Sequence, residues 1–152
     1  MNSTTSDRPR PSTVAMFVER RDATTRWSDN DMYGHLNNAV YYQLFDAAIN
    51  GWLIERTGVD PSTSQELAVV VESGCRFHHQ LAFPDRLQVG LRVVRLGRTS
   101  VTYELGLFSA NASESTSVAA VGTWVHVYVD RATRRPTDIP KDTRALFESA
   151  FG

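Results

Sequence analysis

Five polar residues that could do chemistry lie within ten positions of one another, in the segment SDNDMYGHLNN. They are Asp29, Asp31, His35, Asn37 and Asn38. A carboxylate in such a segment could attack a carbonyl as a nucleophile or activate a water molecule as a general base. The segment precedes a predicted helix, and the free N–H groups and positive dipole end of a helix start could stabilise a substrate oxyanion. The segment is therefore the candidate active site.

Two other interpretations fit the same residues. Asp, Asn and Gly are common in turns, and an asparagine before a helix often caps it, so the segment could be a purely structural loop. A metal site is the second alternative because Asp31 and His35 could both be ligands. The sequence offers no third ligand at a recognisable spacing, so we expect no metal.

The residues after this segment predict the element that must position it. The stretch 39–58, AVYYQLFDAAINGWLIERTG, predicts a helix of about five turns that ends at Gly58. Its apolar residues cover most of the circumference, and only Gln43, Asp46 and Asn50 form a polar stripe. A helix that is apolar nearly all round is a buried helix, so we expect the rest of the domain to enclose it.

The remaining elements are mostly strands. Residues 14–27 have strand character with a charged interruption at Glu19–Asp22. Four further strands are predicted after the helix, the first with an irregularity near Gly74. A tight turn at Gly97 joins the second and third of these, and a short helix is expected at the C-terminal end. The four segments are 67–80, 86–97, 98–111 and 117–130. Hairpin connections make an antiparallel sheet, and strands separated from one long helix predict the α+β class, with a curved sheet around the helix.

Length and composition limit the classes of function. The chain has 152 residues, which fits one domain; we place it at 14–152, after a disordered lead at 1–13. The formal net charge of -1 gives no argument for binding nucleic acid or an anionic membrane. The single cysteine, Cys75, favours a reducing compartment, and neither a signal peptide nor a membrane span is recognisable. We expect a cytoplasmic protein.

The segment RWSDNDMYGHLNNAVYYQLFDAA closely resembles the signature of 4-hydroxybenzoyl-CoA thioesterase-like proteins, a branch of the hot-dog superfamily. It also resembles the corresponding segment of plant acyl-ACP thioesterases, and the similarity extends over roughly residues 14 to 140. The resemblance implies the hot-dog fold, in which a sheet wraps around one long helix. It implies a hydrolase that cleaves the thioester of acyl-CoA, or of an acyl-carrier protein, to a free acid and a thiol.

The resemblance also implies roles for the candidate residues. Asp31 matches the catalytic carboxylate, and the backbone N–H of Asn38 would polarise the thioester carbonyl. Asp29 and Asn37 would support the loop. His35 matches a histidine of the plant branch, where it orients the carboxylate or relays a proton; Tyr33 stands where that branch has an asparagine, which leaves a plant-type triad open.

A second group of residues is implied to bind substrate. The resemblance places the RLGRTS hairpin near the pantetheine and phosphates of CoA, which makes its residues candidate CoA contacts: Arg95, Gly97, Arg98, Thr99 and Ser100. The alternative is a hairpin turn with solvated arginines.

Three other residues that could do chemistry receive no catalytic role. His78 and His79 end a predicted strand without an evident partner, and a lone cysteine such as Cys75 is usually a small core residue.

The partners follow from the same resemblance. It implies an acyl-CoA substrate, no bound cofactor, and a homodimer with two sheets side by side and the active sites at the interface, which could associate further into a homotetramer. Nucleic acid and membrane are not expected as partners. Two alternative functions stay open: a hot-dog enoyl-CoA hydratase or dehydratase, and a non-catalytic acyl-CoA binder.

Overall fold

The computed structural model describes residues 10–152. Within this range the chain forms one five-stranded sheet, two α-helices and two short 3-10 helices. In chain order the elements are η1 (Val14–Met16), β1 (Glu19–Ala23), η2 (Trp27–Asp29), α1 (Asn38–Thr57), β2 (Glu66–Phe77), β3 (Leu87–Leu96), β4 (Ser100–Ser109), β5 (Ala120–Asp130) and α2 (Lys141–Phe151). The predicted α+β composition is confirmed.

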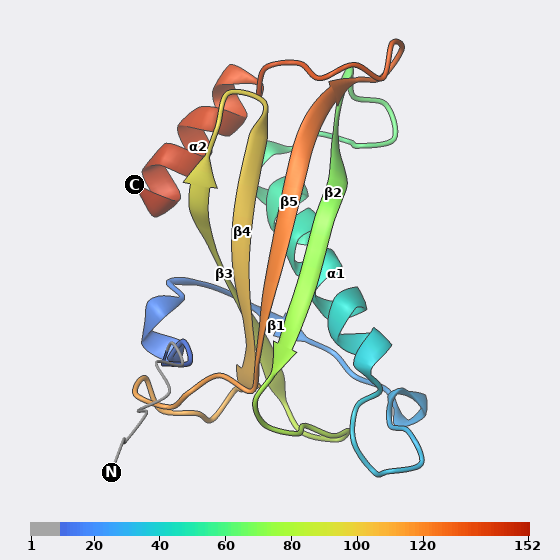
Figure 1. Cartoon of the computed structure of the whole chain (residues 1–152), viewed down its shortest axis with the longest axis vertical. Coiled ribbons are helices and arrows are strands. Elements are labelled where there is room, and N and C mark those ends of the chain that lie inside the picture. The colour runs from blue at the N-terminus through green and yellow to red at the C-terminus, as the bar shows by residue number, and fades with distance from the viewer. Residues whose placement is uncertain (1–9) are drawn as a thin grey trace, which may run out of the picture.

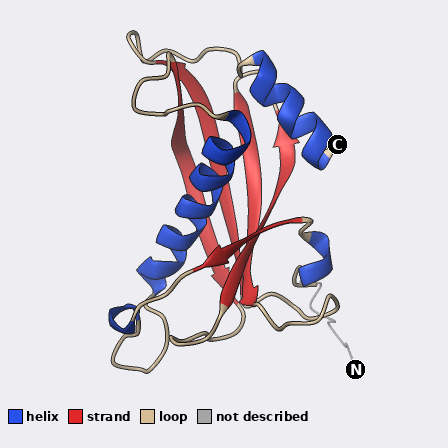
Figure 2. Ribbon diagram, turned by 180° about the vertical axis from the view of Figure 1, so that it is seen from behind, coloured by secondary structure: helices blue, strands red, loops and turns tan. Residues whose placement is uncertain are grey.

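The sheet is antiparallel throughout, with the strand order β1-β3-β4-β5-β2. Consecutive strands β3, β4 and β5 pair with one another, while β2 pairs with β5, so β1 and β2 are the two edges. Figure 1 shows α1 behind β5 and β2, and Figure 2 shows from the other side that α1 and α2 cover the same face of the sheet. A curved sheet around one long helix is the hot-dog fold, as predicted.

The irregularity of β2 lies elsewhere than the sequence predicted. The register with β5 shifts between Val70 and Glu72, so that Val71 is the extra residue. The prediction of an irregularity near Gly74 is wrong, because Gly74 pairs regularly with Thr123. A glycine tolerates a bulge but does not require one.

The main hydrophobic core lies between α1 and the sheet. Phe45, Ile49 and Trp52 of α1 are buried against Tyr103 and Leu105 of β4, among other strand residues. The α2 helix closes one end of this core, where Phe147 stacks on Trp52 with ring centroids 6.1 Å apart. Burial of these large side chains contributes most of the stabilisation.

The outer side of α1 departs from expectation. The sequence predicted a helix enclosed all round, but Tyr42, Gln43, Asp46 and Ala47 are exposed in the single chain. One sheet can cover only one side of a helix, which leaves the opposite side of α1 open beside β2.

A smaller core lies on the opposite face of the sheet. Phe17 is fully buried there beside Phe108, with ring centroids 6.5 Å apart. Its ring fits over two paired glycines, Gly90 of β3 and Gly106 of β4. A Cβ at Gly90 would lie 2.4 Å from the Cβ of Phe17, so only glycine leaves room for this ring.

The N-terminal part of the chain is only partly as predicted. Of the predicted strand at 14–27, only Glu19–Ala23 is a strand, because 3-10 turns form at both ends. The predicted interruption at Glu19–Asp22 is wrong, because these charged residues lie on an edge strand and pair with β3. Residues 1–9 of the expected lead lie outside the described residues. Before Val14 the chain already contacts the sheet region, since the carbonyl of Ser12 accepts a hydrogen bond of 2.9 Å from the N–H of Val118.

The short C-terminal helix is confirmed as α2. No helix within residues 10–152 has the length and apolar character needed to cross a membrane.

Candidate active site

The loop before α1 is closed by its own backbone. The N–H of Asp31 donates to the carbonyl of His35 at 2.8 Å, and the N–H of Gly34 donates to the carbonyl of Asp31 at 3.1 Å. Gly34 has φ 83°, a conformation that costs little only for glycine. Asp31 therefore stands at one end of a tight turn and His35 at the other.

The carboxylate of Asp31 is half-buried and has one hydrogen bond within the described part of the chain. Its Oδ1 accepts from the N–H of Tyr33 at 2.9 Å. That contact fixes the direction of the side chain while the second carboxylate oxygen makes no hydrogen bond to residues 10–152. An oriented carboxylate with one free oxygen can act on a carbonyl carbon or on a water molecule.

Asp29 has a structural position. It is 5% exposed, and its carboxylate accepts from the N–H of Arg26 at 2.8 Å and from the Arg26 guanidinium at 3.0 Å. The hydrogen bonds from Arg26 outweigh desolvation and lower the pKa of Asp29, so it is ionised at neutral pH. Its backbone carbonyl also accepts from the N–H of Asn37 at 2.9 Å, which ties the two ends of the loop together.

The start of α1 presents a free N–H group. Asn37 is the N-cap, and its Oδ1 accepts from the N–H of Ala39 at 2.9 Å. Asn38 is the first residue of the helix, is exposed, and its N–H makes no hydrogen bond within residues 10–152. Such an N–H at the positive end of a 20-residue helix can donate to an oxyanion.

These residues surround one hollow. Asp31, His35 and Asn38 line a cavity of about 550 Å³, which also involves Tyr33, Leu36 and Tyr41. The Nδ1 atom of His35 is buried without a hydrogen-bond partner among the described residues. The three residues with implied catalytic roles thus meet at the N-terminus of α1.

The far wall of the hollow was not expected from the sequence. It comes from the end of β2 and the turn after it, namely Phe77, His78, His79 and Gln80. The N–H groups of both histidines donate to the carbonyl of Ala119, at 2.8 and 2.9 Å. Their place opposite Asp31 depends on contacts between distant segments, such as the 2.8 Å bond from the N–H of Leu36 to the carbonyl of Leu81.

Cys75 takes no part in this hollow. Burial raises the pKa of its thiol to about 11, so the sulfur is protonated at neutral pH and is a poor nucleophile.

The second predicted group lies apart from the hollow within the chain. The β3–β4 hairpin is at the opposite end of the sheet from the loop before α1 (Figure 1). The carbonyl of Gly97 accepts from the Arg144 guanidinium of α2 at 2.5 Å, and that of Thr99 from the N–H of Tyr128 at 2.8 Å. Arg98 forms an exposed ion pair with Asp138, and Arg95 is exposed.

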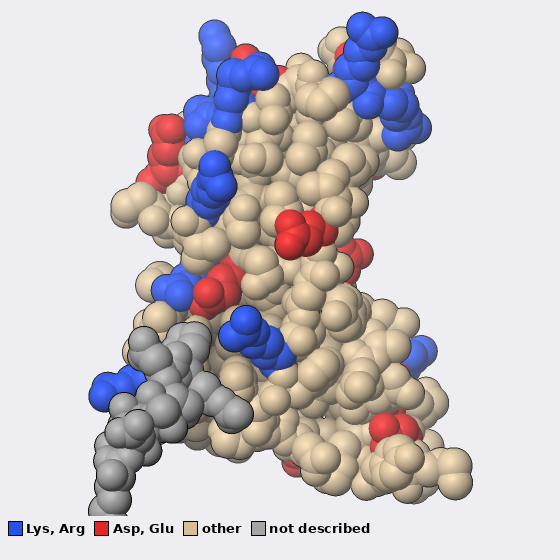
Figure 3. Space-filling view, in the orientation of Figure 1, with Lys and Arg blue, Asp and Glu red and all other residues tan. Residues whose placement is uncertain are grey.

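This end of the molecule is its basic end. Figure 3 shows Lys and Arg side chains gathered at the two upper corners, where the β3–β4 hairpin and the connection from β5 to α2 lie. The connection contributes Arg131, Arg134 and Arg135. Few charged side chains cover the middle of the same face.

Comparison with known proteins places the chain in a family. Residues 25–147 match the model of a family described as the thioesterase-like superfamily. The chain belongs to this superfamily. It is a thioester hydrolase with the hot-dog fold, as the signature of residues 26–48 predicted.

Solved structures agree with this assignment. The chain is 40% identical to the PA5185 protein of Pseudomonas aeruginosa, covering 94% of this chain and 98% of that one, with a TM-score of 0.88. It is 30% identical to the PA2801 protein of the same organism, with 86% and 98% covered and a TM-score of 0.77. It is 25% identical to a thioesterase of Thermus thermophilus solved with coenzyme A and zinc, with 88% and 94% covered and a TM-score of 0.71. No curated protein sequence matches the chain.

Proposed function

We propose that this thioesterase hydrolyses acyl-CoA, with Asp31 as the acting carboxylate and the N–H of Asn38 as the oxyanion donor. The observation that carries the proposal is the meeting of Asp31, His35 and the free helix-start N–H around one hollow. A coenzyme A complex of the similar Thermus thermophilus thioesterase supports CoA as the carrier, and acyl-carrier protein is the alternative.

The reaction needs two events at the thioester carbonyl. The free oxygen of Asp31 attacks the carbon, or removes a proton from a water molecule that does so, and the carbonyl oxygen becomes an oxyanion held by the Asn38 N–H. Collapse of this intermediate breaks the carbon–sulfur bond and releases the CoA thiolate. Along the nucleophilic route, water then hydrolyses the acyl-Asp31 anhydride and restores the carboxylate. His35, beside Asp31, orients the carboxylate or carries the proton.

The test is a panel of acyl-CoA substrates in which released CoA thiol is measured. The Asp31→Asn variant should lose about 100-fold to 10,000-fold in kcat, as expected for a missing acid–base or nucleophilic group. The control is Asp22→Asn, which alters an exposed aspartate on β1 and should keep wild-type rates. Wild-type activity in Asp31→Asn would refute the assignment. Hydration of an enoyl-CoA without thiol release would show a hydratase, and binding without turnover would show a non-catalytic binder.

We infer that the enzyme works as a homodimer formed through β2. This strand is an edge of the sheet, and its outer side has no strand partner within residues 10–152. Val70, Val71 and Phe77 on β2 are 46%, 59% and 45% exposed, and Tyr42 on the open side of α1 is 37% exposed. An apolar, unpaired edge favours pairing with a second copy. A two-fold axis makes that pairing antiparallel.

The same pairing supports a role for the basic end. Antiparallel β2 strands bring the hairpin end of one copy toward the loop end of the other, so Arg98 and its neighbours would reach CoA phosphates in the second copy's site. Arginine contacts to phosphate weaken with salt. We therefore expect KM for acyl-CoA to rise with ionic strength, and to rise less steeply in Arg98→Ala.

The dimer is tested by molar mass in solution. Val71→Arg places a charge on the β2 edge and should give a monomer with little activity. Its matched control is Val94→Arg, which changes an exposed valine at the β-bulge of β3, far from the β2 edge of the sheet. A dimeric, active Val71→Arg enzyme would contradict the β2 interface. We further place the enzyme in the cytoplasm, without a bound cofactor, on the grounds given by its sequence.

A further inference from the structure

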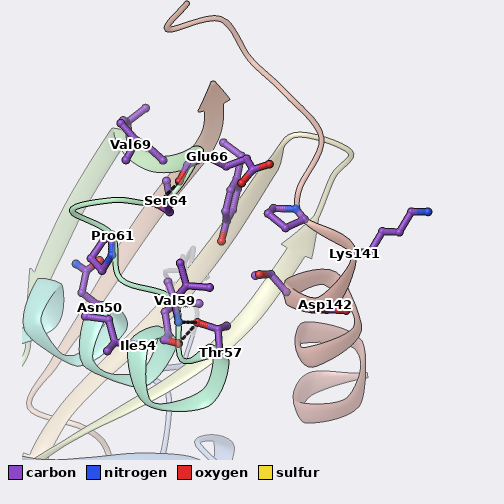
Figure 4. A pocket seen from close by; sticks show the side chains of 16 residues that line it. Asn50, Ile54, Thr57, Val59, Pro61, Ser64, Glu66, Val69, Lys141 and Asp142 are labelled. Carbon is purple, nitrogen blue, oxygen red and sulfur yellow. Dashed lines mark hydrogen bonds between the residues drawn. The ribbon is translucent and has the colours of Figure 1, made fainter. Parts of the chain in front are cut away.

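A second cavity lies where no functional residue was predicted. It has a volume of about 440 Å³ and is bounded by the C-terminal half of α1, the start of β2, β5 and the start of α2 (Figure 4). Aliphatic side chains make much of its wall, among them Leu53, Ile54, Val59, Leu67 and Val69. A concave, largely aliphatic cavity of this size suits a small apolar ligand.

Two hydroxyl groups interrupt the aliphatic wall. Tyr128 of β5 and Thr143 of α2 both line the cavity and are 6% and 7% exposed. Neither hydroxyl has a hydrogen-bond partner within residues 10–152. Burial raises the pKa of Tyr128, so its phenol is protonated and can donate. Both hydroxyls are therefore free to hydrogen-bond with an oxygen of a ligand in the cavity, and a few such polar groups in an aliphatic wall fix the orientation of a ligand.

The cavity and the Asp31 hollow lie at opposite ends of the same strand. The cavity touches β2 at residues 66–69, and the hollow touches it from Phe77 onward. Phe77 lies eight positions after Val69 along the strand, about 26 Å at the usual rise per residue. A thioester bound at Asp31 would not place its acyl chain in the cavity of the same chain.

The proposed dimer brings the two together. If two β2 strands pair antiparallel about their common centre, near Val71, then Glu66 of one copy lies opposite Phe77 of the other. The aliphatic cavity of each copy then adjoins the Asp31 hollow of its neighbour. One ligand can then occupy the Asp31 hollow of one copy and the aliphatic cavity of the other.

We propose that this cavity binds the acyl chain of the substrate, and that the preferred chain is aliphatic and carries an oxygen, as a hydroxyl or keto group, that meets Tyr128 and Thr143. The proposal rests on the proposed function, since it assumes that Asp31 of the second copy cleaves the thioester. It defines the substrate class as oxygenated aliphatic acyl thioesters, in place of short or aromatic ones.

Chain length gives the first test. With straight-chain acyl-CoAs from acetyl upward, kcat/KM should rise about fourfold for each added methylene until the cavity is full, because each buried methylene contributes about 0.8 kcal/mol. Ala68→Leu and Leu53→Phe each fill part of the cavity, and either should lower the ratio of long-chain to acetyl kcat/KM by about tenfold or more. The control Ala145→Leu, at an exposed position of α2, should keep the wild-type ratio.

The oxygen is tested separately. Across hydroxyacyl-CoAs of one length with the hydroxyl at successive carbons, the wild type should favour one position over the unsubstituted chain. Tyr128→Phe should reduce that preference about threefold to tenfold, the usual effect of one hydrogen bond. If the preference is absent in the wild type, or survives in both Tyr128→Phe and Thr143→Val, the oxygen contact is wrong.

Mixed dimers test the use of the cavity across the interface. In a mixed dimer of one Asp31→Ala chain and one Ala68→Leu chain, the Ala68→Leu chain keeps an intact Asp31 hollow and the Asp31→Ala chain keeps an open cavity. Long-chain activity should return to about a quarter of wild type if the two work across a two-fold dimer. No recovery, with each homodimer behaving as described, overturns the proposal. Absence of thiol release from every acyl-CoA, acetyl-CoA included, would instead refute the proposed function.

Discussion

A histidine buried beneath α1 should make the stability of this enzyme fall as the pH drops below neutrality. His126 of β5 is 1% exposed, and neither ring nitrogen has a hydrogen-bond partner within the described residues. Its ring lies edge-on to that of Tyr103, with centroids 5.3 Å apart. Burial lowers the pKa of His126 from 6.5 to about 4, and the carboxylate of Asp46 offsets only part of this effect.

The direction and size of the effect follow from that pKa. Well above pH 6.5 the imidazole is neutral in both the folded and the unfolded chain and contributes nothing to the pH dependence. Between pH 6.5 and 4 the unfolded chain binds a proton that the folded chain excludes, so the free energy of unfolding decreases as the pH falls. The loss from pH 7 to pH 5 is about 2 kcal/mol, and it approaches about 3 kcal/mol near pH 4.

Urea unfolding of the wild type and of His126→Leu at a series of pH values measures the contribution of His126 to the pH dependence of stability. The variant replaces the imidazole with an apolar side chain of similar size, so its free energy of unfolding should fall about 2 kcal/mol less between pH 7 and 5. The control is His79→Gln, which removes an exposed imidazole and should keep the wild-type slope. If the free energy of unfolding falls equally with pH in the wild type and in His126→Leu, then His126 is protonated as readily in the folded chain as in the unfolded chain, and the predicted pH dependence is refuted.

Substitutions at three positions test other parts of the structure by thermal or urea unfolding. Gly106→Ala should destabilise by about 1–3 kcal/mol, because the added Cβ would lie 2.7 Å from the ring of Phe17; no loss would mean that the ring moves freely. Gly58→Ala should cost about 1 kcal/mol, since φ is 68° at this helix end, whereas Gly58→Asn should cost less. Asp29→Ala should cost about 1–3 kcal/mol by leaving the N–H of Arg26 without its acceptor, and its kcat should fall because the loop that holds the active carboxylate loosens.

Local signals in the sequence were sufficient for the long helix, the four strands after it and the C-terminal helix. The helix could be predicted to its end because Gly58 supplies the left-handed residue that a C-cap requires. The turn at Gly97 could be predicted because a glycine between two strand segments favours a tight turn, and the N–H of Gly97 does pair with the carbonyl of Ser100. The segment containing Asp31 could be predicted as a site because it combines carboxylates with a helix start. These features depend on residues only a few positions apart.

The features that were missed depend on distant parts of the chain. His78 and His79 face the hollow only because their N–H groups both reach Ala119, and nothing near them in sequence indicates this. The bulge at Val71 reflects a mismatch in length between paired strands, which a residue type does not reveal. The aliphatic cavity combines side chains from α1, β2, β5 and α2, so no single segment carries its pattern.

The packing of Phe17 over two glycines has a consequence for how this sequence can diverge. Because Gly90 and Gly106 are register partners under one ring, neither can gain a side chain while position 17 holds phenylalanine. A relative with a larger residue at position 90 or 106 should therefore have a smaller one at position 17, and the three positions should covary. The same contact means that a shortened chain beginning after residue 18 would lack the Phe17 ring and expose an apolar groove over Gly90 and Gly106 beside Phe108. Side chains of other molecules could enter this groove, so the shortened chain should associate more readily.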